Sequence, residues 1–234
     1  MTRALLLALA SAVGVVASAT PLPREEAERL AVARAFGTWT DPAGDCTYRL
    51  DGGRVCVRVP AYPRSATEWL PGPLTPPRFE HAIAGDFTAS VRVEVPHQPD
   101  GRLGVQNPGG SRFVAAGLTA RDAAGNRAGV RKFEKMDNGF RTAYGAAWGK
   151  ANAGGGGSGT GPQKDADPRL FLRLSRTGPT VTFATSTDGV TWRDYGKQEL
   201  GWDGPVTLGL IAENTTGTPV EVAFDRFQLD RLKK

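Results

Sequence analysis

The ten residues DFTASVRVEV, at positions 86–95, alternate between apolar and polar side chains at every step. The apolar set is Phe87, Ala89, Val91, Val93 and Val95. Alternation with a period of two is typical of a β-strand that buries one face and leaves the other in water. The same pattern recurs at 170–175, 206–210 and 220–224, and about eleven such runs follow residue 39. These runs predict an all-β, antiparallel, two-sheet sandwich or barrel.

Turn residues and composition agree with this fold class. Asp51-Gly52-Gly53 and Asp188-Gly189 fall between strand-like runs and tolerate positive φ angles, so neighbouring strands should pair as hairpins. The chain of 234 residues holds 30 Gly and 17 Pro, which argues against a bundle of long helices. One segment breaks the pattern, because 153–161 consists mostly of glycine, and we expect 150–168 to form a mobile surface loop.

The N-terminus has the three parts of a secretory signal peptide. Arg3 supplies a positive charge, an apolar run extends from Ala4 to Val16, and Ala17-Ser18-Ala19 is a small-residue cleavage site. The apolar run is too short to cross a bilayer. We therefore expect residues 1–19 to be removed, residues 20–35 to form a helical leader or tether, and the protein to be secreted or periplasmic without stable membrane insertion.

Charge and histidine content exclude several functions. The formal net charge is +5, but the most basic cluster, Arg127, Arg131, Lys132 and Lys135, is interrupted by acids. We interpret it as a solvated strand face and expect no nucleic-acid partner. With two histidines, a three-histidine metal site is excluded.

The two cysteines are Cys46 and Cys56, on either side of the predicted turn at 51–53. In an oxidising compartment a hairpin there brings them close enough for a disulfide if the strand register allows it. The register is not determined by the sequence.

Several segments together resemble the concanavalin A-like lectin/glucanase superfamily, which includes laminin-G-like modules, and within it an uncharacterised bacterial family. The resemblance covers 36–232 and rests on DPRLFLRLSR (167–176), STDGVTW (186–192), VTLGL (206–210), WTDPAGDC (39–46), GDF (85–87), AGL (116–118) and FDRF (224–227). It implies a jelly-roll sandwich with one concave face, here expected to be a monomer. It does not imply a particular reaction.

Catalytic motifs of this superfamily are missing from the sequence. Glucanases of this kind carry a Glu-x-Asp-x-x-Glu triplet, and the residue two positions after Glu94, where the motif requires Asp, is Pro96. A Gly-x-Ser-x-Gly nucleophile elbow is also missing. We expect a non-catalytic protein that binds carbohydrate or another extracytoplasmic ligand. A glycoside hydrolase or lyase with acids from separate strands, and a purely structural or protein-interaction module, are the alternatives.

The segment 186–192 resembles the aspartate-box hairpin of sialidases, although it is one residue shorter. We expect Asp188 to accept backbone N–H groups in the turn and Trp192 to be a core residue beneath it.

Sandwiches of this type also suggest a structural calcium ion near the chain ends. By this resemblance its ligands are Asp86, Asp225 and the carbonyl of Gly85. The alternative is that Asp86 only accepts hydrogen bonds from turn amides.

Strand parity selects the ligand-binding candidates on the concave face. They are Arg131, Phe171 and Arg173, together with Tyr144 and Trp148 on the neighbouring run. Aromatic faces and charged tips suit a glycan surface. The alternative, equally weighted, is that Phe171 lies under a loop and the arginines only solubilise the face.

Overall fold

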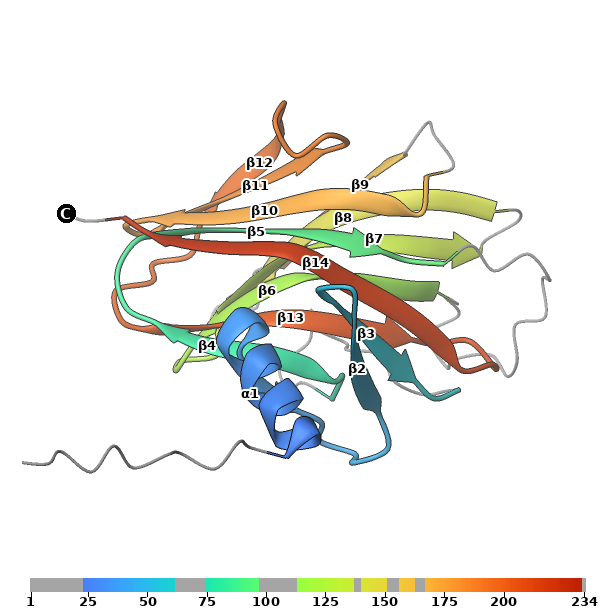
Figure 1. Ribbon diagram of the computed structural model, residues 1–234. Coiled ribbons are helices and arrows are strands. Elements are labelled where there is room, and N and C mark those ends of the chain that lie inside the picture. The colour runs from blue at the N-terminus through green and yellow to red at the C-terminus, as the bar shows by residue number, and fades with distance from the viewer. Residues whose placement is uncertain are drawn as a thin grey trace, which may run out of the picture.

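The computed structural model describes residues 23–61, 75–96, 113–136, 140–150, 156–162 and 167–232 (Figure 1). The predicted signal peptide at 1–19 lies outside these residues. In the described part, one helix, α1 (Arg24–Phe36), precedes fourteen strands. The strands are β1 (Thr38–Thr40), β2 (Thr47–Asp51), β3 (Arg54–Val59), β4 (Arg78–Ile83), β5 (Phe87–Glu94), β6 (Phe113–Asp122), β7 (Arg127–Met136), β8 (Phe140–Gly149), β9 (Gly156–Pro162), β10 (Arg169–Thr177), β11 (Thr180–Ser186), β12 (Arg193–Glu199), β13 (Val206–Asn214) and β14 (Val220–Arg231).

The strands form two antiparallel sheets of seven strands each, which confirms the predicted sandwich. The first sheet has the order β1-β4-β13-β6-β7-β8-β9, and the second has the order β12-β11-β10-β5-β14-β3-β2. The alternating stretch at 86–95 supplies β5, near the centre of the second sheet, between β10 and β14. The two sheets lie face to face in Figure 1.

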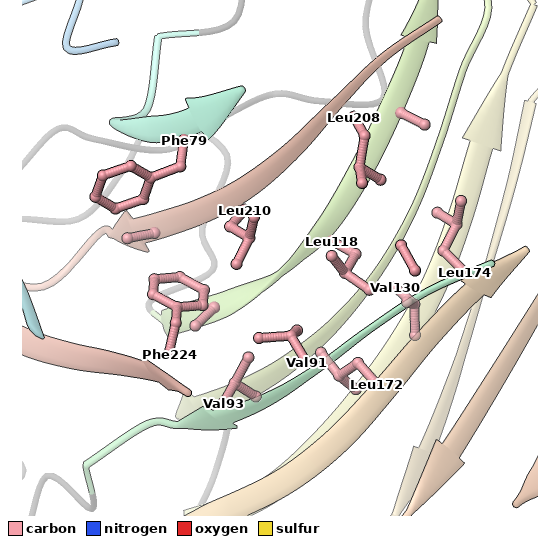
Figure 2. Close-up of a cluster of buried hydrophobic side chains, with 14 of the residues drawn as sticks. Phe79, Val91, Val93, Leu118, Val130, Leu172, Leu174, Leu208, Leu210 and Phe224 are labelled. Carbon is pink, nitrogen blue, oxygen red and sulfur yellow. The ribbon is translucent and has the colours of Figure 1, made fainter. Parts of the chain in front are cut away.

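Side chains from the facing surfaces of the two sheets form the core (Figure 2). Leu118, Val130, Leu208 and Leu210 come from the first sheet, and Val91, Val93, Leu172, Leu174 and Phe224 come from the second. All of them are fully buried. Burial of each large aliphatic side chain contributes about 1.5–3 kcal/mol, so these inward residues hold the sheets together.

The glycine-rich segment was predicted as a loop, and part of it is a strand. β9 pairs with β8 at the edge of the first sheet. Gly157 lies opposite Trp148, and a Cβ atom on this glycine would be 3.1 Å from the indole ring. The missing side chain thus makes room for Trp148, which packs against the core. Residues 151–155 lie outside the described part.

Helix α1 packs against the sandwich and is not a free tether. Its buried residues are Val32 and Phe36. The ring of Phe36 lies 6.2 Å from that of Phe79 on β4 and 6.4 Å from that of Phe227 on β14, measured between centroids. The helix therefore contacts strands of both sheets, as its position across β4 in Figure 1 also shows.

His81 lies beneath the end of α1. It shares the inward side of β4 with Phe79 and stacks on Phe227 with a centroid distance of 5.2 Å. Its Nε2 atom is buried and has no hydrogen-bond partner within the part of the chain that the structure describes. A Cβ atom on Gly37, the residue after α1, would be 2.7 Å from that nitrogen. Burial lowers the pKa of His81, although a hydrogen bond to the backbone of Phe36 acts in the opposite direction.

The predicted hairpin at 51–53 forms, but its register separates the cysteines. Cys56 pairs with Arg49 of β2, so Cys46 lies three residues further along the ladder and on the other side of the sheet. Cys46 belongs to the core cluster, whereas Cys56 alternates with the inward-facing valines of β3. Cys46 and Cys56 are not bonded to one another, so the disulfide that depended on the register is not formed.

The basic cluster is not a uniformly solvated face. Lys132 has the same parity as Val130 and faces the core, where its side chain is 0% exposed. Its Nζ atom lies 3.2 Å from a carboxylate oxygen of Glu134, which is 4% exposed. Burial lowers the pKa of Lys132, and the charge of Glu134 opposes this effect. The presence of several basic residues in one segment does not reveal that one of them points inward.

Candidate functional site

A cleft of about 570 Å³ lies between α1 and the strands at the edge of the second sheet. We call it the helix cleft. Its lining residues are Glu25, Glu28, Arg29, Val32, Trp39, Cys46, Thr47, Tyr48, Arg49 and Leu50. This volume lies within the range of roughly 300–1,000 Å³ that is usual for small-molecule sites. The cleft exists because α1 docks through Val32 and Phe36 while its opposite side stays in solvent.

Two aromatic residues form the apolar part of the helix cleft. The rings of Trp39 and Tyr48 are 4.9 Å apart between centroids, at 58° to one another. Both rings also contact Phe79, at 4.8 and 5.2 Å, so the core fixes their positions. Trp39 and Tyr48 are themselves half-buried, which leaves part of each ring at the surface.

Charged side chains of both signs surround these rings. Glu25, Glu28 and Arg29 are exposed and come from α1. Arg49 of β2 forms ion pairs with Asp51 and Glu221, which raise its pKa. The helix cleft therefore combines aromatic surface with hydrogen-bond donors and acceptors.

Next to the helix cleft, side-chain oxygen and sulfur atoms of Asp41, Asp45 and Cys46 lie within 4.8 Å of one another. The Asp41 carboxylate accepts hydrogen bonds from the backbone N–H groups of Ala43 and Cys46, at 3.2 and 2.7 Å. These contacts assign Asp41 to the turn that leads into β2.

The residues expected to bind calcium do not form one site. Asp86 comes directly before β5, whereas Asp225 on β14 pairs with Arg92 near the other end of β5. Arg92 follows Asp86 by six residues, so Asp86 and Asp225 are separated by about 20 Å along the strand. Asp225 forms a bidentate ion pair with Arg92, in which Nε of Arg92 lies 2.7 Å from Oδ1 of Asp225. Asp86 accepts a hydrogen bond from the backbone N–H of Gly178, which is the alternative role weighed for it. Gly85 has a φ of +79° in the turn before β5. The three residues do not fit a shared calcium ion.

The five residues selected for ligand binding lie on three different surfaces. Arg131 is on the outer side of the first sheet, and Tyr144 and Trp148 have the opposite parity and pack with the core. Phe171 and Arg173 are on the outer side of the second sheet. Strand parity was read correctly for β7 and β10 but not for β8, because Tyr144 and Trp148 face the core and not the ligand-binding surface. Parity also does not tell to which sheet a strand belongs.

Phe171 lies under a loop, as the alternative reading anticipated. It is 8% exposed, and a Cβ atom on Gly189 would be 2.8 Å from its ring. Trp192 meets it edge to face with a centroid distance of 6.5 Å. Trp192 was expected in the core; it is instead half-buried on the outer face, with the guanidinium of Arg173 only 3.6 Å from its ring centroid.

Asp188 holds the hairpin that covers Phe171. Its carboxylate accepts the backbone N–H groups of Val190 and Thr191, both at 2.8 Å, and the hydroxyl of Ser186. These hydrogen bonds lower the pKa of Asp188 far below its usual range. The turn role predicted for this residue is confirmed.

Arg131 is a structural residue in the described part of the fold. Its guanidinium forms an ion pair with Glu213 of β13, and the two side chains are 8% and 0% exposed. The pair spans β6, where Gly117 lies directly opposite Arg131. A Cβ atom on Gly117 would be 2.7 Å from Cγ of Arg131 and 2.2 Å from the carbonyl oxygen of Val130. The arginine crosses β6 because this position has no side chain.

Sequence reasoning missed the helix cleft. Neither Trp39 nor Tyr48 was among the residues selected for ligand binding. The sequence did contain one indication of the cleft: two aromatic residues, Trp39 and Tyr48, follow a leader helix that carries acidic residues in its first turn. The docking of that helix, which creates the cleft, depends on contacts that sequence pattern does not define.

No family model matches the chain, and no curated protein sequence matches it. Solved structures do share its fold. A functionally unknown protein from Saccharomyces cerevisiae is 16% identical, with a TM-score of 0.63, and the match covers 84% of this chain and 97% of that one. An alginate lyase from Klebsiella pneumoniae is 11% identical, with a TM-score of 0.55, covering 79% and 84%. A legume lectin-like domain from Entamoeba histolytica is 12% identical, with a TM-score of 0.50, covering 96% and 100%. At these identities the similarity establishes the jelly-roll fold and nothing further.

Among the described residues, no helix has the length and apolar character needed to span a membrane.

Proposed function

We propose that this protein is an exported, non-catalytic β-sandwich module that binds carbohydrate in the helix cleft. The observation that carries the proposal is the pair of half-buried rings, Trp39 and Tyr48, within a cleft of about 570 Å³ that is bordered by charged side chains. The signal-peptide pattern at 1–19 supports export.

The chemistry of a sugar matches this lining. One side of a pyranose ring presents C–H groups, which pack against aromatic faces, and its hydroxyl groups both donate and accept hydrogen bonds. Trp39 and Tyr48 offer aromatic surface, while Glu28 accepts and Arg29 donates. Because the core contacts of both rings hold them in place, little side-chain entropy is lost on binding.

The positions of the acids favour binding over hydrolysis. Glycoside hydrolysis needs two carboxyl groups on opposite sides of the scissile bond, and one of them must be kept protonated by its surroundings. Glu25 and Glu28 lie on the same helix and are exposed, and Glu28 forms an ion pair with Arg24. They therefore line one wall of the helix cleft rather than flank a bond within it.

A glycan-array screen of the chain from Thr20 tests the proposal, with calcium in one arm and chelator in the other. We expect reproducible binding to one class of glycan. Three variants are then measured by titration calorimetry: Glu28→Gln, Arg29→Gln and Trp39→Phe, the last of which keeps packing against Phe79 but shortens the stacking face. Glu28→Gln and Arg29→Gln should each weaken binding by about tenfold or more, since a hydrogen bond to a charged group contributes about 1.5–3 kcal/mol. Trp39→Phe should weaken binding because less aromatic surface stacks on the sugar.

Matched controls come from the other side of the same helix. Glu26→Gln and Arg34→Gln remove the same charges from exposed positions that do not line the helix cleft, and they should leave the Kd within twofold. Equal losses for cleft and control variants would contradict the proposal. Failure to bind any glycan would favour a structural or protein-interaction module, and cleavage of a glycan would favour the hydrolase or lyase alternative.

A further inference from the structure

A second cluster of side chains lies on the outer face of the second sheet, on strands β5, β10 and β14 and on the connection between β11 and β12. We call it the arginine patch and define it as Arg92, Phe171, Arg173, Trp192 and Arg226. Its guanidinium groups surround two rings. Those of Arg92 and Arg226 lie 5.9 and 5.8 Å from the ring centroid of Phe171, and that of Arg173 lies 3.6 Å from the ring centroid of Trp192.

The charges of the arginine patch are not balanced within it. The charge of Arg92 is neutralised by its bidentate ion pair with Asp225. Arg173 and Arg226 have no ion pair and no hydrogen-bond acceptor among the described residues, and the Nε atom of Arg173 is buried without a partner. Desolvation lowers the pKa of Arg173, while the more distant Asp194 and Asp230 act in the opposite direction. Two positive charges therefore lack a partner.

The backbone of Arg226, which belongs to the arginine patch, is strained. Arg226 has a φ of +49°, and it is the one non-glycine residue with positive φ in the described part of the chain. It lies in a bulge, because two residues of β14 between Asp225 and Gln228 face one residue of β5. The bulge lets Arg226 follow Asp225 onto the outer face, while Phe227 turns inward and stacks on Phe36. Such strain persists only where the surroundings enforce it, and it is concentrated at functional sites.

We propose that the arginine patch is a second binding site, which takes the carboxylate or sulfate group of an acidic sugar. Arg173 and Arg226 supply the donors for the anionic group, and the half-buried ring of Trp192 supplies the surface for the sugar ring. We expect the patch to hold one anionic group of the sugar, because Asp194 and Asp230 act on Arg173 and Asp225 is already paired with Arg92. This site is separate from the helix cleft and does not depend on it.

The test uses titration calorimetry on the whole chain with three probes: a sulfated heparin oligosaccharide, an oligogalacturonate that carries only carboxylates, and neutral maltohexaose. We expect one or both acidic probes to bind and maltohexaose to fail at the patch. The two acidic arms distinguish sulfate from carboxylate as the recognised group. Single-stranded DNA of equal charge is the comparison polyanion and should bind at least about tenfold more weakly than the better acidic sugar.

The decisive variants are Arg226→Asn and Arg173→Gln. Asparagine tolerates positive φ, so Arg226→Asn removes the guanidinium without straining the bulge further. Each variant should weaken binding of the acidic probe by about fivefold or more. Arg58→Gln is the matched control, because Arg58 is an exposed arginine on the same sheet, in β3, remote from both rings; it should change the Kd by less than twofold.

The outcomes separate this proposal from the proposed function. Glu28→Gln in the helix cleft should not alter binding of the acidic probe at the arginine patch. An equal loss for Arg58→Gln would show that only net charge attracts the probe and would overturn the site. Failure of both acidic probes to bind, or equally tight binding of DNA, would also overturn it, whatever the result for the helix cleft.

Discussion

Gly189 lies so close to Phe171 that a Cβ atom on the glycine would be 2.8 Å from the ring carbon Cε1. The φ of Gly189 is +77°, which is itself unfavourable for other residues. We expect Gly189→Ala to lower the free energy of unfolding by about 2–3 kcal/mol, because backbone strain and steric overlap add. Urea denaturation measures the change.

Gly178→Ala is the control for this substitution. Gly178 has a φ of +57°, and a Cβ atom there meets nothing within 4 Å. Its substitution should cost only the backbone term of about 1–2 kcal/mol. Losses of the same size at both positions would show that the contact with Phe171 does not hold the hairpin against the sheet.

Gly117→Ala should be among the most damaging single substitutions in the first sheet. The added carbon overlaps backbone as well as Arg131, so no side-chain movement relieves it. We expect a loss of about 3 kcal/mol or more in urea unfolding, from overpacking and a disturbed ion pair with Glu213. Gly209→Ala is the comparison, because its added Cβ atom would lie 3.1 Å from Cγ2 of Thr119, a side-chain atom that can move. A smaller loss of unfolding free energy for Gly117→Ala than for Gly209→Ala would contradict the prediction.

Stability should fall as the pH drops below about 6.5, partly through His81. Burial lowers the pKa of His81 in the folded state, so below the unfolded pKa the unfolded chain binds a proton that the folded chain does not. Stability is therefore complete above that pH and decreases on acidification. Melting temperatures between pH 8 and pH 5 measure this, and His81→Phe should flatten that part of the curve. An unchanged slope in the variant would assign the effect to other groups.

The core ion pair between Lys132 and Glu134 should show strong non-additivity. Lys132→Met alone leaves the buried carboxylate without this partner, and we expect it to cost about 3–5 kcal/mol. Adding Glu134→Gln removes the charge and should restore most of the loss. A double-mutant cycle by urea unfolding measures the coupling, and simple addition of the two effects would contradict a dependence of one charge on the other.

The sequence predicted the strands whose two faces differ most in polarity. In β5 and β10 every second residue is buried, because these strands lie between the core and an outer face. β9 and β12 were harder to predict. Their positions at the sheet edges require no apolar alternation, and in β9 a glycine is favoured by the ring of Trp148.

The candidate sites were less predictable, because they depend on which sheet each strand joins. Tyr144 and Phe171 were placed on one surface from parity, although β8 and β10 belong to different sheets. A single extra residue in β14 then reverses parity, so Arg226 faces outward and Phe227 inward. Local patterns define which side of a strand is buried, whereas strand order and bulges arise only from the assembled sandwich.

The late strands of the chain occupy central positions in both sheets. β13 lies between β4 and β6, and β14 lies between β5 and β3. During synthesis on the ribosome, neither sheet has its middle until residues 206–231 have emerged. Until then β4, β5 and β6 each have one unpaired edge, the edge that later pairs with β13 or β14. The nascent chain therefore cannot reach its compact state gradually from the N-terminus, and a holding chaperone has a long interval in which to bind it.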